Sequence, residues 1–181
     1  MGNGLVLSVY PGIDLQGRAF EEEGCCVVRG PDPLWGGDIR TFHPPAGVFE
    51  GVIGGPPCQR WTRLQFLNPN VGKGLDWVIS EFARVVEEAA PHWFLMENVP
   101  FAPMPLARGY RCYDVLLADE DVGGIQPRRR RFTFGTPDGR MLWVVYHEPS
   151  GNGGHQSILA DRRAVPVKIG GSGKEKRSIL S

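Results

Sequence analysis

Short apolar runs alternate with helical patterns along the first 136 residues of the chain. The apolar runs occupy residues 5–10, 25–28, 48–55, 92–99, 110–118 and 131–136, and glycine, proline or polar residues bound them. Residues 74–90 carry apolar side chains at helical spacing, and residues 15–24 predict a second helix. One more strand is expected at 140–148. Strands that alternate with helices in short units predict an α/β fold with a mostly parallel sheet.

The carboxyl ends of the predicted strands carry two candidate reactive side chains. Cys58 follows one strand directly, and Glu97 lies at the end of another. Ligands of open α/β sheets bind where the strands run into loops, so we expect these two side chains to converge. Two glycines and two prolines (residues 54–57) precede the cysteine; the prolines fix φ, and the glycines admit a close neighbour. A structural cysteine in a stiff turn is the alternative.

The charge and cysteine content narrow the function classes. The 181 residues suit one domain with zero formal net charge, but residues 1–125 hold 9 Lys/Arg and 16 Asp/Glu, whereas residues 126–181 hold 11 and 4. A basic end suits a polyanionic partner, and a solvated surface with a basic tail fits the charges equally well.

The four cysteines form no CxxC pair, which indicates neither a metal site nor a disulfide framework. No apolar run has membrane-spanning length and no leader is evident, so we expect a cytoplasmic protein without membrane contact, located with nucleoid or phage DNA if it binds DNA.

Three short motifs occur in order, each beside a predicted strand end: PPCQ at 56–59, ENV at 97–99 and QPRRR at 126–130. Together they resemble the DNA cytosine methyltransferases that modify carbon 5, and the resemblance covers roughly residues 5–136. It implies the class I S-adenosylmethionine-dependent methyltransferase fold, Rossmann-like, with helices flanking a mostly parallel sheet. It also implies a catalytic domain over residues 1–149 and a basic, partly flexible extension over residues 150–181.

The resemblance implies methyl transfer from S-adenosylmethionine to carbon 5 of cytosine through a cysteine adduct. A thiolate added at carbon 6 breaks the aromaticity of the ring and makes carbon 5 nucleophilic. By the motif match, Cys58 is the nucleophile, Glu97 is the acid at N3, and Arg128 holds O2. Arg130 is expected to order the site or to contact phosphate. The alternatives are a strand-end carboxylate satisfied by backbone for Glu97 and a solvated loop for the arginines.

The cofactor half of the chain resembles the family less closely. Residues 9–24 match the first motif at Tyr10 and Gly12, but Asp14 replaces its second glycine. The turn is expected to offer backbone N–H groups to the cofactor carboxylate. Asp32 is the candidate for the ribose hydroxyls and Asp38 for the adenine amino group, and both also fit ordinary turn aspartates. S-adenosylhomocysteine is the expected product. The predicted cofactor contacts are Tyr10, Gly12, Asp14, Asp32, Asp38, Pro57 and Asn152.

The loop after Cys58 is basic, aromatic and glycine-containing over residues 60–74. Thr62 stands near the place of a usual family serine. Such a loop could close on DNA and fill the space of an extruded base, and a loop that covers the core is equally compatible. The predicted DNA contacts are Gln59, Arg60, Trp61, Arg63, Gln126, Arg129 and Arg131.

Only 45 residues follow Thr136, where family members normally insert a target-recognition region. Four interpretations follow. The protein could modify cytosine in short or relaxed sequence contexts, or a partner or a second copy in a homodimer could supply the recognition region. It could also act on single strands or nucleotides, or it could be a non-catalytic DNA-binding remnant. We favour the first, because the residues that the chemistry needs are all present. The target sequence and the oligomeric state stay open.

Overall fold

The computed structural model describes residues 4–62 and 67–141, which form one sheet with helices around it. The strands are β1 (Leu5–Val9), β2 (Cys26–Arg29), β3 (Gly51–Gly54), β4 (Trp93–Asn98), β5 (Arg111–Ala118) and β6 (Arg129–Thr136). The α-helices are α1 (Leu15–Glu22) and α3 (Val78–Ala89), and the short 3-10 helices are η1 (Pro33–Trp35), η2 (Ile39–Thr41), η3 (Gln59–Trp61) and η4 (Asp119–Val122). Within these ranges every helix is too short or too polar to span a bilayer.

The sheet has the strand order β2-β1-β3-β4-β6-β5. β2, β1, β3 and β4 are parallel, whereas β6 runs antiparallel to both of its neighbours. From β1 the chain passes through α1 to β2, and it then crosses to the other side of β1 to form β3. The topological switch point, where α/β folds bind their ligands, therefore lies between β1 and β3. The predicted α/β fold with a mostly parallel sheet is confirmed.

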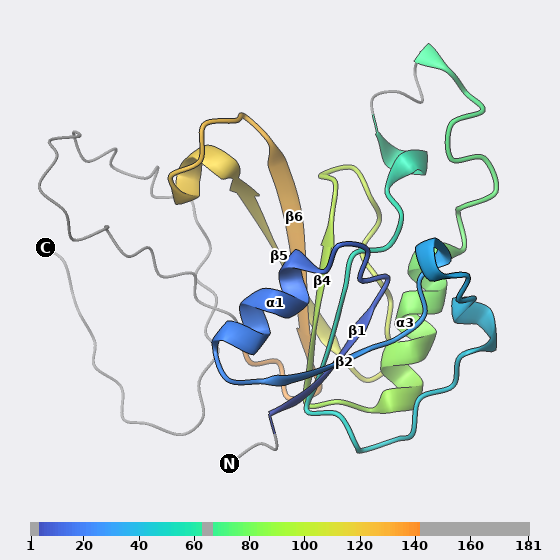
Figure 1. Cartoon of the computed structure of the whole chain (residues 1–181), viewed down its shortest axis with the longest axis vertical. Helices are drawn as coiled ribbons and strands as arrows, with labels where there is room; N and C mark the ends of the chain where they lie inside the picture. Colours follow the sequence, from blue (N-terminus) through green and yellow to red (C-terminus); the bar gives the residue numbers. More distant parts are fainter. Residues whose placement is uncertain (1–3, 63–66, 142–181) are drawn as a thin grey trace, which may run out of the picture.

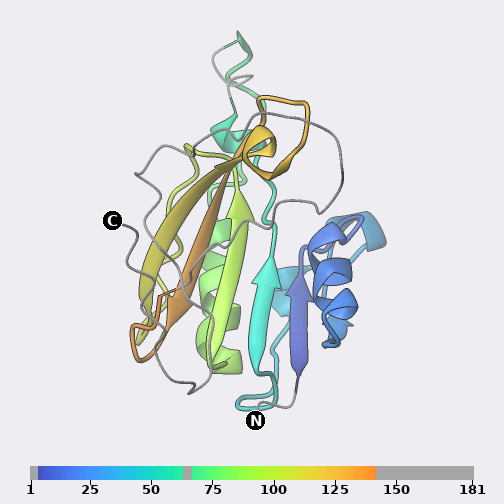
Figure 2. The same ribbon diagram turned by 90° about the vertical axis from the view of Figure 1, so that its left-hand side faces the viewer.

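The two α-helices cover opposite faces of the sheet (Figures 1 and 2). On the α3 face, helically spaced side chains such as Val78, Phe82 and Val86 are fully buried, and the Phe82 ring meets the Phe94 ring edge-on at 5.8 Å. On the α1 face, the Phe20 ring stacks on the Trp93 ring at 5.4 Å. Burying each large side chain contributes about 1.5–3 kcal/mol, so both helices hold the sheet rigidly beneath its loops.

Most element boundaries differ from the sequence prediction by one to four residues, and three of the differences have a clear cause. β1 ends at Val9 because Tyr10 adopts a left-handed φ of 54°. α3 begins at Val78, not at residue 74, because the chain before it forms turns with positive φ at Gly72 and Gly74. β6 begins at Arg129, two residues earlier than predicted, so three of the four consecutive arginines belong to the strand and Arg128 directly precedes it. The strand predicted at 140–148 lies, from residue 142 onward, outside the described residues.

Candidate functional site

A pocket of about 330 Å³ lies where the loops after β2, β3 and β4 meet the segment that leads into β6. Cys58, Glu97, Arg128 and Arg130 line it together with Pro57 and Asp32. The expected convergence of Cys58 and Glu97 is thus present in the structure. The pocket also contains the two arginines that the sequence placed beside them.

Cys58 reaches the pocket on the rigid turn that follows β3. Pro56 and Pro57 carry no backbone N–H and restrict φ, so the turn has few conformations. Cys58 is the N-cap residue of η3, and its carbonyl accepts a hydrogen bond from Trp61 N–H at 2.9 Å. Its side chain is half-buried against the hydrophobic core. The turn therefore gives the sulfur a defined place at the pocket wall.

Glu97 and Arg130 form an ion pair across two adjacent strands. Their Oε1 and Nε atoms are 2.6 Å apart, and both side chains are about one quarter to one third exposed (31% and 24%). Alternate residues of a strand share a face, so Arg128 and Arg130 point to the same side of the β6 segment, which is the pocket side. The Oε2 atom of Glu97 lies next to Gly55. Arg130 thus orients the carboxylate at the pocket.

The remaining residues of the QPRRR region lie elsewhere. Arg131 belongs to the opposite face, where its NH1 donates to the Ala102 carbonyl at 2.6 Å and its Nε lies 3.6 Å from Asp114 Oδ2. Its guanidinium thus fastens the segment after β4. Arg129 and Gln126 are exposed and do not belong to the pocket lining. The DNA contacts predicted for all three stay predictions.

The loop after Cys58 packs on itself in its described part. Arg60 Nε lies 2.8 Å from Asp76 Oδ1, and Gly72 lies so close to the Arg60 backbone that a Cβ there would clash. The Trp61 side chain packs partly against the core, as the core-covering interpretation expects. Gln59 lines the pocket, and Thr62 Oγ1 donates to the Gln59 carbonyl at 3.2 Å. Arg63 lies outside the described residues.

Asp14, in place of the family's glycine, caps helix α1. Its Oδ1 accepts hydrogen bonds from Gly17 N–H and from the Ser8 hydroxyl, both at 3.0 Å. Its Oδ2 lies 2.8 Å from Arg29 Nε, so a cation balances the carboxylate. Aspartate tolerates the left-handed conformation found here, with φ of 52°. The side chain is buried among these partners, and its predicted contact with the cofactor stays a prediction.

Asp32 links the first motif to the pocket. Its Oδ2 accepts from Gly12 N–H at 2.8 Å and its Oδ1 from Leu34 N–H at 2.7 Å. The carboxylate therefore fixes the turn after β1 to the loop after β2, and Asp32 and Leu34 both border the pocket that holds Cys58.

Asp38 and Tyr10 lie apart from that pocket lining. Arg40 donates from Nε to both Asp38 carboxylate oxygens and from NH2 to Oδ2, and these hydrogen bonds lower the pKa of Asp38 to about 2. Tyr10 is buried and donates its hydroxyl to the Val78 carbonyl at 3.2 Å, and burial raises its pKa. Asn152 lies outside the described residues.

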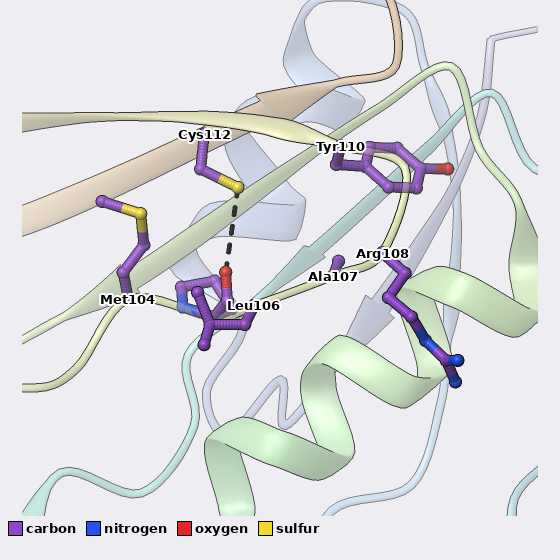
Figure 3. Close-up of a pocket in the computed structure, with 7 residues that line it drawn as sticks. Met104, Leu106, Ala107, Arg108, Tyr110 and Cys112 are labelled. Carbon is purple, nitrogen blue, oxygen red and sulfur yellow. Dashed lines mark hydrogen bonds between the residues drawn. The ribbon is translucent and has the colours of Figure 1, made fainter.

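A second hollow of about 300 Å³ lies between residues 104–108 and β5 (Figure 3). Cys112 lines it, and its thiol donates a hydrogen bond to the Pro105 carbonyl, with a sulfur–oxygen distance of 3.7 Å. Burial raises the pKa of the Cys112 thiol, and the nearby Asp114 carboxylate raises it further. A thiol held neutral is a poor nucleophile, so Cys58 is the better candidate of the two.

Known proteins are similar to this chain in sequence and in fold. Residues 36–103 match the family model of C-5 cytosine-specific DNA methylases. The type II methyltransferase M.SacI of Streptomyces achromogenes is 29% identical over 162 residues, which cover 72% of this chain and 40% of that protein. M.FnuDI of Fusobacterium nucleatum is 32% identical over 102 residues, 48% of this chain and 28% of that protein.

Over residues 36–103 this chain is similar to the C-5 cytosine-specific DNA methylases. It spans less than half the length of these two methyltransferases. A prophage DNA modification methyltransferase of E. coli has the same fold, with a TM-score of 0.57 and 19% identity over 73% of this chain and 46% of that one. The fold is the class I S-adenosylmethionine-dependent methyltransferase fold, as the resemblance implied.

The range that matches the methylase family model contains some of the pocket residues, and the structure adds the others. The matched range contains Cys58 and Glu97, whereas Arg128 and Arg130 lie beyond it and join the pocket through β6. Sequence reasoning missed Leu34 and Val99 in the lining. Their signal was their position two residues after Asp32 and Glu97, in the loop after β2 and directly after β4 respectively.

Proposed function

We propose that this chain is a catalytic core that transfers a methyl group from S-adenosylmethionine to carbon 5 of cytosine in DNA, through a covalent adduct on Cys58. The observation that carries the proposal is the convergence of Cys58, Glu97 and Arg128 in one pocket of about 330 Å³. The similarity of residues 36–103 to the C-5 cytosine-specific DNA methylases supports the reaction class.

Each pocket residue has a distinct task in the proposed reaction. The Cys58 thiolate forms a bond to carbon 6, and the ring electrons move toward carbon 5 and N3. The Glu97 carboxyl donates its proton at N3, and the Arg128 guanidinium donates hydrogen bonds to O2. Arg130 orients Glu97 through the 2.6 Å contact. Carbon 5 then forms a bond to the methyl group as the bond between that methyl and the sulfonium breaks. Release reverses the addition: the proton on carbon 5 passes to water, the sulfur–carbon bond breaks, the thiolate leaves carbon 6, and the N3 proton returns to Glu97.

The described residues fit S-adenosylmethionine beside the nucleophile. Asp32 and Leu34 border the same pocket as Pro57 and Cys58, so a carboxylate acceptor and an apolar surface lie next to the sulfur. Asp32 would accept hydrogen bonds from the ribose hydroxyls, and Leu34 would cover an apolar part of the nucleoside. When bound, the cofactor supplies an electrophilic methyl group on a sulfonium.

The sequence context of the substrate belongs to the same proposal. We expect short or relaxed specificity on DNA, with affinity that falls steeply as salt rises because arginines such as Arg129 meet phosphates. Mapping of methylated sites tests this: a long, strict recognition sequence modified by the chain alone would contradict it. Activity on single strands, or DNA binding without catalysis, would appear in the same experiments.

Mechanism-based trapping tests the reaction. A fluorine at carbon 5 cannot leave as a proton, so the chain should form an adduct with 5-fluorocytosine DNA in the presence of S-adenosylmethionine, visible on a denaturing gel. Cys58→Ser should abolish the adduct. Cys112→Ser is the matched control, because a hydroxyl can still donate to Pro105 and the adduct should persist. A non-catalytic DNA-binding remnant would bind the same DNA and form no adduct.

A further inference from the structure

Asn98 ends β4 directly after Glu97, and its side chain is almost completely buried (1% exposed). Neighbouring residues of a strand point to opposite faces, so Asn98 lies behind the pocket that Glu97 faces. Its Nδ2 donates to the Pro56 carbonyl at 3.1 Å, and its Oδ1 accepts from Val99 N–H at 2.8 Å. Both ends of the amide are thus engaged by backbone groups.

The bond to Pro56 connects the two walls that carry the reacting groups. Pro56 lies two residues before Cys58, and Asn98 lies one residue after Glu97. Pro56 and Pro57 have no N–H with which to anchor the turn themselves. Among the described residues, the Asn98 amide makes the one side-chain hydrogen bond to the Gly55–Cys58 turn. This bond therefore sets how far the turn stands from the end of β4.

We propose that Asn98 is a positioning residue, which holds Cys58 at the separation from Glu97 that lets both groups reach one cytosine ring. This inference rests on the proposed function and adds a residue to it. Asn98 stands outside the pocket lining, so its loss changes the geometry of attack without removing a contact to DNA or cofactor. A misplacement of about 1 Å in such a site lowers a rate by about a hundredfold.

Asn98→Asp isolates the hydrogen bond to Pro56. The variant keeps the shape and the acceptor for Val99 N–H, but it presents a carboxylate oxygen to the Pro56 carbonyl. At about pH 8, adduct formation on 5-fluorocytosine DNA should slow by roughly ten- to a hundredfold, while the Kd for that DNA stays within about twofold. Burial beside a carbonyl oxygen favours the neutral carboxyl, so lowering the pH to about 5 should increase the protonated fraction, which can donate to Pro56 again, and the ratio of the two rates should narrow.

Ser80→Asp is the control, because it adds the same charge at an exposed position of α3 and should leave the rate unchanged. If Asn98→Asp does not fold, Asn98→Ser decides: it should fold, bind DNA as the unaltered chain does and form the adduct more slowly. A folded variant with the unaltered rate at about pH 8, or one that loses DNA affinity in proportion to rate, overturns the positioning role. If the unaltered chain forms no Cys58-dependent adduct, the proposed function itself fails and this inference falls with it.

Discussion

Two adjacent glycines before Cys58 should respond to alanine in opposite ways. A Cβ on Gly54 would lie 2.6 Å from the Val9 carbonyl oxygen and 2.9 Å from the Phe82 ring. Neither neighbour can yield easily, because Val9 pairs with Gly54 in the sheet and the Phe82 side chain of α3 is fully buried. A Cβ on Gly55 would meet only Glu97 Oε2, at an ordinary contact distance of 3.5 Å.

The magnitudes follow from these contacts. Gly54→Ala overpacks a rigid site, which costs about 1–3 kcal/mol. At about 2–4 °C per kcal/mol for a chain of this size, Tm should fall by about 2–12 °C. Gly55→Ala should leave stability unchanged or raise it by up to about 1 kcal/mol, because alanine restricts the unfolded chain. Its methyl group would nevertheless stand against Glu97 in the pocket, so adduct formation should slow.

Thermal unfolding followed by circular dichroism, together with the trapping assay, separates the two effects. Gly54→Ala should lower Tm, whereas Gly55→Ala should lower the adduct rate at unchanged Tm. If both variants melt at the same temperature as the unaltered chain, the close packing of β3 between β1 and α3 is not what requires glycine at position 54. Equal destabilisation by both would refute the distinction between the core-facing and the pocket-facing glycine.

Two further predictions concern stability. Burial raises the pKa of Tyr110 to about 12, and its hydroxyl donates to the Pro91 carbonyl at 2.7 Å. Because folding favours the neutral phenol, the stabilisation from Tyr110 is complete below the unfolded pKa of about 10 and is lost as pH rises toward about 12. In urea unfolding, the free energy of unfolding of Tyr110→Phe should therefore fall less between these pH values than that of the unaltered chain. An identical fall in both proteins would contradict this. Asp14→Ala should lower the free energy of unfolding by about 0.5–2 kcal/mol, since Gly17 N–H and the Ser8 hydroxyl lose their acceptor. Asp14→Asn keeps an acceptor oxygen and should retain most of the free energy of unfolding. If guanidinium unfolding gave the same free energy for both variants, Asp14 would not act as a helix cap.

The apolar pattern predicted the elements well and their limits less well. The pattern over residues 74–90 runs past the start of α3 because Leu75 and Trp77 also pack against the core, from the turn before the helix. Periodicity reports burial, and a well-packed turn buries side chains as a helix does. β6 starts earlier than predicted for the converse reason: Arg129 pairs with Ala118 in the sheet although its side chain is exposed.

Partners far along the chain explain why the cofactor residues were harder to predict than the pocket. Motif spacing suggested Asp32 and Asp38 as ligand contacts, but it contains no information about which groups their carboxylates meet. In the structure Asp32 accepts from Gly12 N–H, twenty residues away, and Asp14 meets Arg29. Those contacts depend on the pairing of β1 with β2, which a family pattern does not specify.

The direction of β6 accounts for the order of the pocket residues along the chain. In the parallel strands β3 and β4, the loop edge of the sheet lies at the carboxyl end, so Cys58 follows its strand and Glu97 lies near the end of its own. β6 runs the opposite way beside β4, so its amino end reaches that same edge. Arginines placed before or at the start of an antiparallel strand therefore meet side chains placed after parallel ones. Had β6 been parallel, Arg128 and Arg130 would lie at the far edge of the sheet, with no path to the cysteine.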